Sequence, residues 1–216
     1  ALESTNLFAR SVGDTSDIVN KELYTFSDKN DKSITLRPEG TASVIRSIIE
    51  KKLDGETHKL WYLGPMWRYE RPQKGRFRQF YQAGVEILGY SEGISEFEMI
   101  SLVCELNRKL LINKPLIKIN HLGDTETKKL FCDALVEYLI PMKSDLDEKD
   151  IQRLDKNPLR ILDSKNPKTQ EILKQAPSIS EYLPKSSKEL LKSIQEIFSN
   201  ECSIEIDYNL VRGLDY

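Results

Sequence analysis

The chain has 216 residues and a formal net charge of −2, with 39% hydrophobic and 31% charged residues. These values are typical of a globular protein with one sizeable domain, or one domain that carries an insertion. The three cysteines are far apart and form no CxxC pair, which argues against a disulfide framework and against a zinc site. Each cysteine is most simply a free thiol, so we expect a reducing, cytoplasmic location. No apolar run reaches the roughly 20 residues that cross a bilayer, so we expect no membrane partner.

The first predicted elements are a hairpin and a helix. Short β-like runs at residues 23–26 and 33–36 flank a polar turn cluster. The segment RPEGT at residues 37–41 then ends the strand pattern, and Thr41 is the expected N-cap of a helix that runs to about Leu53. Taken alone, RPEGT is best interpreted as a turn with a cap, although the Glu39 carboxylate could receive a substrate ammonium group.

A second predicted hairpin, with strands at 59–68 and 78–88, carries a concentrated basic loop. Residues 67–79 contain five basic residues and one acid, in a chain that is near neutral overall. Arginine side chains on a strand pair are well suited to binding phosphate. The local excess of positive charge therefore indicates a phosphate-binding hairpin.

Period-two alternation assigns the side chains of this hairpin to two faces. One face of the second strand is predicted to carry Phe80, Gln82, Gly84 and Glu86, beside Arg68 of the first strand. The glycines at 64 and 84 are expected to leave floor space for a ligand. The opposite, apolar face, which includes Tyr81, is expected to pack on helices. A solvated sheet face is the simpler interpretation of any one residue, but the combination favours a binding surface.

The rest of the chain is predicted to be mixed and then helical. A helix at 96–111, a strand at 116–122 and a helix at 125–139 precede a lysine-, glutamate- and proline-rich stretch of short helices, and 202–207 returns to strand. The fold class is therefore α+β, with a mostly antiparallel sheet. We expect a catalytic core at 1–122, a helical insertion region at 123–200 and a return to the core at 201–216.

Four motifs, in order along nearly the whole chain, resemble signatures of the histidyl-tRNA synthetases, a family of class II aminoacyl-tRNA synthetases. They are TLRPEGT at 35–41, GPMWRYERPQKGRFRQFYQAGVE at 64–86, NPLRILDSKNP at 157–167 and LVRGLDY at 210–216. The resemblance implies a class II antiparallel sheet flanked by helices. It also implies that L-histidine and ATP form histidyl-adenylate, from which histidine passes to tRNA(His).

The resemblance also implies roles for individual residues. For ATP, Arg68 is expected to contact the α-phosphate and Arg76 the γ-phosphate. Glu70 is expected near the adenine amino group, and the Phe80 ring is expected under adenine. The expected histidine contacts match Glu39, Thr41, Gln82, Glu86, Arg212 and Tyr216. Arg212 is also expected at the α-phosphate, so Arg68 and Arg212 are the expected catalytic residues. The expected tRNA acceptor-end loop contains Arg71, Gln73 and Lys74.

Magnesium is expected to arrive with ATP and bridge its phosphates, with no metal site formed by protein residues alone. The first and third class II motifs do not occur among these residues. We therefore interpret the chain as a fragment that is inactive alone, with a homodimer expected for the parent protein and left open for the fragment.

Two other classes of function remain open. One is a synthetase-like regulatory subunit of ATP phosphoribosyltransferase, which binds histidine but acylates nothing. The other is a pseudo-synthetase domain that senses uncharged tRNA. The intact stretches at 37–41 and 70–72 argue against the first, and the retention of Arg68, Glu86 and Arg212 argues against the second.

Overall fold

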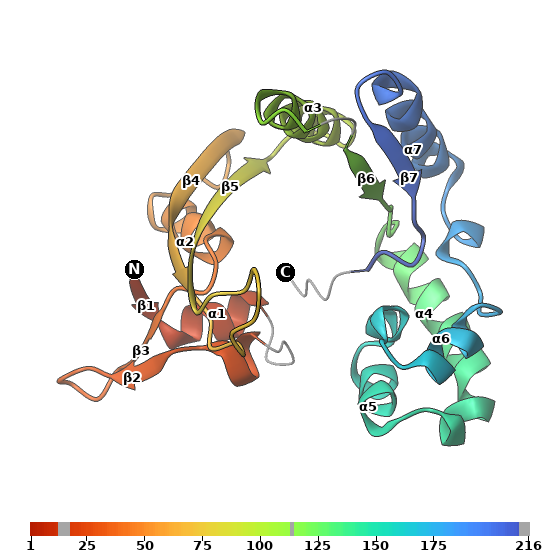
Figure 1. Cartoon of the computed structure of the whole chain (residues 1–216), viewed down its shortest axis with the longest axis horizontal. Helices are drawn as coiled ribbons and strands as arrows, with labels where there is room; N and C mark the ends of the chain where they lie inside the picture. Colours follow the sequence, from red (N-terminus) through yellow and green to blue (C-terminus); the bar gives the residue numbers. More distant parts are fainter. Residues whose placement is uncertain (13–17, 113–114, 212–216) are drawn as a thin grey trace. The chain divides into compact units, whose positions relative to one another are not determined.

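A computed structural model describes residues 1–12, 18–112 and 115–211 of the chain. These residues form two compact units, 1–95 and 96–211, each with its own strands and helices (Figure 1). The combination of helices with antiparallel strand pairs confirms the predicted α+β class. Within the described part of the chain, every helix is too short or too polar to span a bilayer.

The first unit begins with a small antiparallel sheet and its helices. Its elements are β1 (Leu2–Ser4), α1 (Thr5–Val12), the π-helical turn η1 (Ile18–Glu22), β2 (Thr25–Ser27), β3 (Ser33–Leu36) and α2 (Thr41–Glu50). The sheet order is β1-β3-β2, and the predicted β2–β3 hairpin is confirmed. Asp28 closes its turn by accepting from the backbone N–H groups of Asn30 and Lys32. The fully buried Phe8 packs with Ala42, and this contact joins α1 to α2.

The second predicted hairpin is confirmed as β4 (His58–Trp67) and β5 (Gln79–Leu88), which pair over their whole length. Tyr62 lies opposite Gly84, and Met66 lies opposite Phe80. Directly opposed residues share a face of an antiparallel pair. We call one face the Phe80 face, which carries Tyr62, Gly64, Met66, Phe80, Gln82, Gly84 and Glu86.

The other face of this hairpin, the Tyr81 face, is not buried by helices as expected. Trp61 is 77% exposed, Leu63 65% and Tyr81 73%. The alternation of apolar residues was correctly assigned to one face, but no helix in the described residues of the first unit covers these three side chains. Period-two patterning identifies an apolar face, while its cover depends on segments far away in the sequence.

The second unit is largely helical and contains a short parallel strand pair. Its elements are α3 (Ile94–Lys109), β6 (Leu116–Ile119), α4 (Thr125–Leu139), η2 (Ile140–Asp145), α5 (Glu148–Lys156), η3 (Pro158–Asp163), α6 (Pro167–Leu173), η4 (Ile179–Glu181), α7 (Lys185–Phe198) and β7 (Ser203–Ile206). β6 and β7 pair in parallel, with Ile117 opposite Ile204. The predicted helix at 125–139 is confirmed, and the predicted stretch of short helices corresponds to η2–α7.

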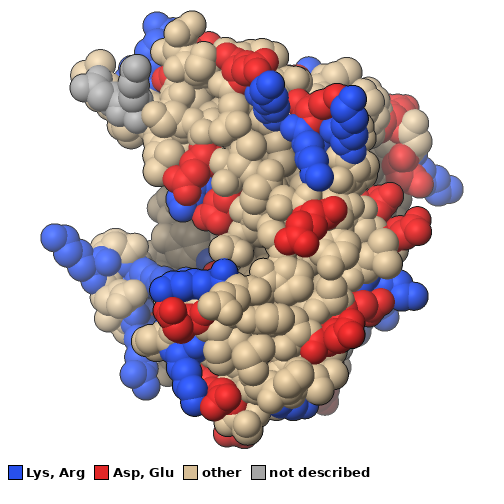
Figure 2. Space-filling view, turned by 90° about the vertical axis from the view of Figure 1, so that its right-hand side faces the viewer, with Lys and Arg blue, Asp and Glu red and all other residues tan. Residues whose placement is uncertain are grey.

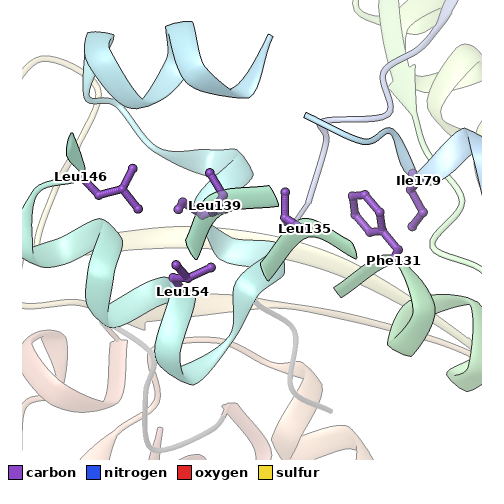
Figure 3. Close-up of a cluster of buried hydrophobic side chains, with 7 residues drawn as sticks. Phe131, Leu135, Leu139, Leu146, Leu154 and Ile179 are labelled. Carbon is purple, nitrogen blue, oxygen red and sulfur yellow. The ribbon is translucent and has the colours of Figure 1, made fainter. Parts of the chain in front are cut away.

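Apolar residues at helical spacing build the larger core of this unit. Phe131, Leu135 and Leu139 lie along one side of α4 and pack with residues of the following helices (Figure 3). Local caps fix where those helices start: the side chains of Asp124 and Asp147 each accept a backbone N–H at the start of α4 and α5. The core and the caps together account for the helical character of residues 125–198.

One charged group lies inside the second unit. Asp150 is 1% exposed, and its carboxylate accepts from Ser164 Oγ at 2.5 Å, Thr169 Oγ1 at 2.7 Å and Arg153 Nη1 at 2.8 Å. These bonds tie α5 to η3 and α6. The polar segment 157–167 is therefore held in place by a satisfied buried carboxylate.

The surface charge is mixed in sign. Figure 2 shows lysines and arginines interspersed with aspartates and glutamates. In the second unit, exposed pairs such as Lys143–Asp155 and Lys168–Asp145 illustrate this pattern. Isolated exposed pairs of this kind contribute little to stability, so the packing and the buried Asp150 matter more there.

Candidate active site

Arg68 lies just after β4 and is held from two directions. Its backbone N–H donates to the Arg78 carbonyl at 2.9 Å, and its side-chain Nε donates to the Pro38 carbonyl at 2.9 Å. The guanidinium carbon lies 5.2 Å from the centroid of the Phe80 ring, which places it on the Phe80 face as predicted. No carboxylate in the described part of the chain pairs with Arg68. Its two outer nitrogens are therefore available to an anion.

Glu39 lies at the start of α2 and is 6% exposed. Its carboxylate accepts from the backbone N–H of Thr41 at 2.6 Å and of Ala42 at 3.1 Å. Burial raises the pKa of Glu39, the backbone N–H groups of Ala42 and Thr41 oppose that rise, and the nearby Glu86 charge adds to it. The expectation that Thr41 is the N-cap is wrong: Gly40 takes that position, and the Glu39 side chain satisfies the first free N–H groups.

The Thr41 hydroxyl instead reaches the hairpin. Its Oγ1 donates to Glu86 Oε1 at 2.6 Å, which joins the first turn of α2 to β5. A buried Gln82 Oε1 on the same face has no hydrogen-bond partner among the described residues. The structure thus brings together four of the predicted histidine contacts: Glu39, Thr41, Gln82 and Glu86.

Two side chains fill the space that the hairpin glycines were expected to leave empty. A Cβ atom at Gly84 would collide with the Tyr62 ring, and one at Gly64 would collide with the Arg37 guanidinium. Arg37 is anchored there by its Nε, which donates to the Pro65 carbonyl at 3.0 Å. The expectation of open floor space is therefore wrong. The missing Cβ atoms at these glycines leave room for the Tyr62 ring and the Arg37 guanidinium.

The basic loop between the strands is exposed and turns at Gly75. Gln73 and Arg76 exchange backbone hydrogen bonds of 3.4 and 2.9 Å, and Gly75 has φ of 81°, a conformation that favours glycine. Arg76 Nη1 lies 3.4 Å from Glu70 Oε2, so the two predicted ATP contacts are neighbours. Arg71, Gln73 and Lys74 are all exposed.

The two hairpin glycines give a matched pair of stability predictions. Gly84→Ala should lower the free energy of unfolding by about 1–2 kcal/mol, because the added methyl meets a ring held in a packed position. Gly64→Ala should cost less than about 1 kcal/mol, because the flexible end of Arg37 can move aside. Urea unfolding of both variants checks this. Equal losses would mean that Tyr62 is not fixed over Gly84.

Comparison with known proteins identifies the family. The sequence profile described as histidyl-tRNA synthetase matches residues 4–216. The chain belongs to the histidyl-tRNA synthetase family. It is similar to the chloroplastic histidine–tRNA ligase of Gracilaria tenuistipitata var. liui, with 49% identity over 100% of this chain and 52% of the relative. It is also similar to the histidine–tRNA ligase of Francisella philomiragia, with 48% identity over 100% of this chain and 52% of the relative.

Solved structures agree with this assignment. The structure of apo S. aureus histidyl-tRNA synthetase has a TM-score of 0.75 and 36% identity, and the match covers 100% of this chain and 48% of that protein. The chain therefore has the class II synthetase fold, and it spans about half the length of the curated relatives that it matches. A Bacillus halodurans protein named as an ATP phosphoribosyltransferase regulatory subunit/histidyl-tRNA synthetase has a TM-score of 0.59 but 19% identity, so it shares the fold alone.

Several features of the chain bear on the predicted residue roles. Arg212 and Tyr216 lie outside the described residues. In the described ranges, no three His, Cys, Asp or Glu side chains gather as a metal site would require.

Tyr62 and Arg37 were not predicted from the sequence as parts of the site. Tyr62 alternates in step with Gly64 and Met66 along β4, so the sequence does carry a signal for its place on the Phe80 face.

Proposed function

We propose that the protein, at its full natural length, is a histidine–tRNA ligase that activates histidine with ATP and transfers it to tRNA(His). The observation that carries this proposal is the arrangement on the Phe80 face. Arg68, which has no carboxylate partner among the described residues, lies beside the Phe80 ring. Farther along β5, Glu86 is joined through Thr41 to a second carboxylate, Glu39, just before α2. The end of the Phe80 face with Arg68 and Phe80 suits a nucleotide phosphate. The end with Glu39 and Glu86 suits a cationic amino acid.

The amino-acid end is negatively charged. The Glu86 charge lies close enough to disfavour ionisation of Glu39, and a cation bound beside Glu39 would relieve that repulsion. Histidine supplies an α-ammonium group and an imidazole N–H. We assign Glu39, Thr41 and Gln82 to the ammonium group and Glu86 to the imidazole. The orphaned Gln82 Oε1 supports this, because a buried acceptor without a donor costs free energy that a ligand donor can recover.

The nucleotide end is positively charged and aromatic. Phe80 can stack under adenine, with Glu70 near its amino group, Arg68 at the α-phosphate and Arg76 at the γ-phosphate. As a histidine carboxylate oxygen bonds to the α-phosphorus, the bond to the β-phosphate breaks and pyrophosphate leaves. A guanidinium held by Pro38 stabilises the charge that develops on the phosphate oxygens during this step. Magnesium would enter bound to the ATP phosphates and neutralise part of their charge. Arg212 and Tyr216 are proposed to complete the site from the segment 210–216.

The remaining assignments concern partners and domains. Arg71, Gln73 and Lys74, which are exposed, are proposed to contact the tRNA acceptor end, where phosphate contacts should make binding salt-dependent. We further propose a homodimer for the whole protein and the division into core (1–122 and 201–216) and insertion (123–200). The expected cytoplasmic location stays a prediction, since the Gracilaria relative is named as chloroplastic.

Glu39 gives a pH-dependent test of the amino-acid end. The pKa of Glu39 in the free protein is raised above the ordinary 4.5. Between pH 4.5 and that raised value, the native state therefore keeps a proton on Glu39 that the unfolded state has lost. The stability contribution of Glu39 should therefore fall as pH rises from about 4.5 through its raised midpoint. Bound histidine should lower that midpoint, because an ammonium group favours the carboxylate.

The measurement is an NMR titration of the Glu39 carboxyl carbon with and without histidine. The carboxyl signal of Glu189, which pairs with Lys185 on the exposed side of α7, serves as the control and should not respond to histidine. A Glu39 midpoint that histidine leaves unchanged would argue against an ammonium group beside this carboxylate.

Transfer of labelled histidine to tRNA(His) by the protein at its full natural length tests the proposed function. Formation of histidyl-tRNA supports it. Histidine binding without adenylate formation would favour the regulatory-subunit alternative. Binding of uncharged tRNA without either activity would favour the tRNA-sensing alternative. The 216-residue chain alone is expected to be inactive, and steady pyrophosphate exchange by it would contradict that expectation.

A further inference from the structure

The chain leaves β7 through a turn at residues 207–210. The Leu210 N–H donates to the Asp207 carbonyl at 2.9 Å, which closes the turn, and the Asn209 N–H donates to Asp207 Oδ1 at 3.1 Å. Lys118 of β6 holds the other oxygen of this carboxylate, with its Nζ 3.0 Å from Asp207 Oδ2. The first half of the turn is therefore tied to the β6–β7 pair.

A single side chain, that of Asn120, holds the second half of the turn. Asn120 follows β6 directly, and its Nδ2 donates to the carbonyls of Tyr208 at 3.3 Å and Leu210 at 3.1 Å. Its Oδ1 accepts from the His121 N–H at 2.8 Å. An asparagine amide has two N–H donors and one carbonyl acceptor, so both ends of this side chain are engaged.

The segment from Asn120 into α4 is itself held by local contacts. The Gly123 N–H donates to His121 Nδ1 at 2.8 Å, and Gly123 has φ of 71°, a conformation that favours glycine. The Asp124 side chain then accepts from the Thr127 N–H at 2.8 Å as the cap of α4. The support beneath Asn120 is thus the capped start of a helix and not a free loop.

This turn immediately precedes the LVRGLDY motif and ends two residues before Arg212, which the proposed function assigns to the active site. Asn209 and Leu210 are exposed, so the turn buries little apolar surface and its bonds to Asn120 act chiefly on the backbone. We propose that Asn120 is a positioning residue, which fixes the backbone that leads into Arg212 and so places that guanidinium for adenylate formation. This inference rests on the proposed function, because the role of Arg212 is assigned there.

The test compares Asn120→Asp with Asn107→Asp in the protein at its full natural length. Asn107 is a matched control: it is half-buried on α3, and its Nδ2 donates to the Val103 carbonyl at 2.8 Å. A carboxylate at 120 can still accept from the His121 N–H, but it cannot donate to the two turn carbonyls and repels them. Asn120→Asp should lower kcat for histidine-dependent pyrophosphate exchange about tenfold or more, since misplacing a catalytic group is costly. Asn107→Asp should change it less than about threefold.

A double-mutant cycle separates the placement of Arg212 from a general loss of structure. Arg212→Lys keeps a positive charge but lacks the planar guanidinium, and its remaining pyrophosphate exchange is measured at high enzyme concentration. In that variant, adding Asn120→Asp should lower kcat less than about threefold further, because the group whose placement it disturbs is gone. A purely structural role of Asn120 would instead give losses that multiply.

A readout without activity separates this inference from the proposed function. The Leu210 N–H, which donates across the turn, should exchange with solvent about tenfold faster in Asn120→Asp, and at an unchanged rate in Asn107→Asp. If the unmodified protein shows no histidine-dependent activity while the Leu210 N–H behaves as described, the proposed function fails and the fixing of the turn by Asn120 stands. The inference is overturned if Asn120→Asp leaves either kcat or the Leu210 N–H unchanged. It is also overturned if both asparagine variants lower kcat equally, or if the losses multiply in the Arg212→Lys variant.

Discussion

Replacing Arg68 by lysine is expected to lower kcat for histidine-dependent pyrophosphate exchange by about a hundredfold or more. The Arg68 guanidinium is anchored through Nε to the Pro38 carbonyl, which leaves two outer nitrogens in a fixed fork. A lysine keeps the charge but cannot make that anchor and still present two parallel donors to a phosphate. The loss should fall mainly on kcat, because charge on the α-phosphate develops in the transition state.

The matched control for this change is Arg78→Lys. Arg78 lies across the hairpin from Arg68, and its guanidinium carbon is 4.4 Å from the centroid of the Tyr69 ring. It has no assigned contact with ATP or histidine, so its replacement should change kcat less than about threefold. Similar losses in both variants would indicate a general effect of basic charge in the hairpin, and would contradict the specific role of Arg68.

The largest expected effect on stability comes from Asp150→Ala in the second unit. Removing this carboxylate leaves the Ser164 and Thr169 hydroxyls and the Arg153 guanidinium without their common partner. Breaking a buried charged network in this way costs about 3–5 kcal/mol. We therefore expect a clear fall in the urea midpoint of the transition that unfolds the second unit, followed by far-UV circular dichroism.

Asp155→Ala provides the control on the same helix. Asp155 is 56% exposed and pairs with Lys143, so its loss should cost less than about 1 kcal/mol. If Asp150→Ala and Asp155→Ala unfold at the same urea concentration, the buried network does not stabilise the second unit as described.

The sequence was sufficient to predict the elements whose signals are local. The 58–88 hairpin follows from alternation, and α4 follows from helical spacing. β1 and α1 were not predicted, because β1 spans three residues and pairs with β3, a contact over a long sequence separation. The parallel pairing of β6 with β7 also depends on residues that are far apart in the chain.

The candidate site was predicted in its residue types but not in its packing. The arginine, phenyl, amide and carboxylate groups of the Phe80 face follow from strand alternation. Tyr62 over Gly84 could not be predicted, because a glycine in a strand is equally compatible with a ligand and with a neighbouring side chain. The capping role of Glu39 was likewise hidden, since RPEGT offered both a carboxylate and a threonine near the helix start.

ATP–pyrophosphate exchange by the protein at its full natural length, with each amino acid supplied separately, tests whether the Phe80 face is a histidine-activating site. The Phe80 face is proposed to bind ATP at Arg68 and Phe80, and histidine at Glu39, Thr41, Gln82 and Glu86. We expect exchange with histidine, no exchange with other amino acids, and a large loss of exchange in Glu86→Gln through a raised KM for histidine. Exchange that depends on a different amino acid, or histidine binding with no exchange at all, would contradict it.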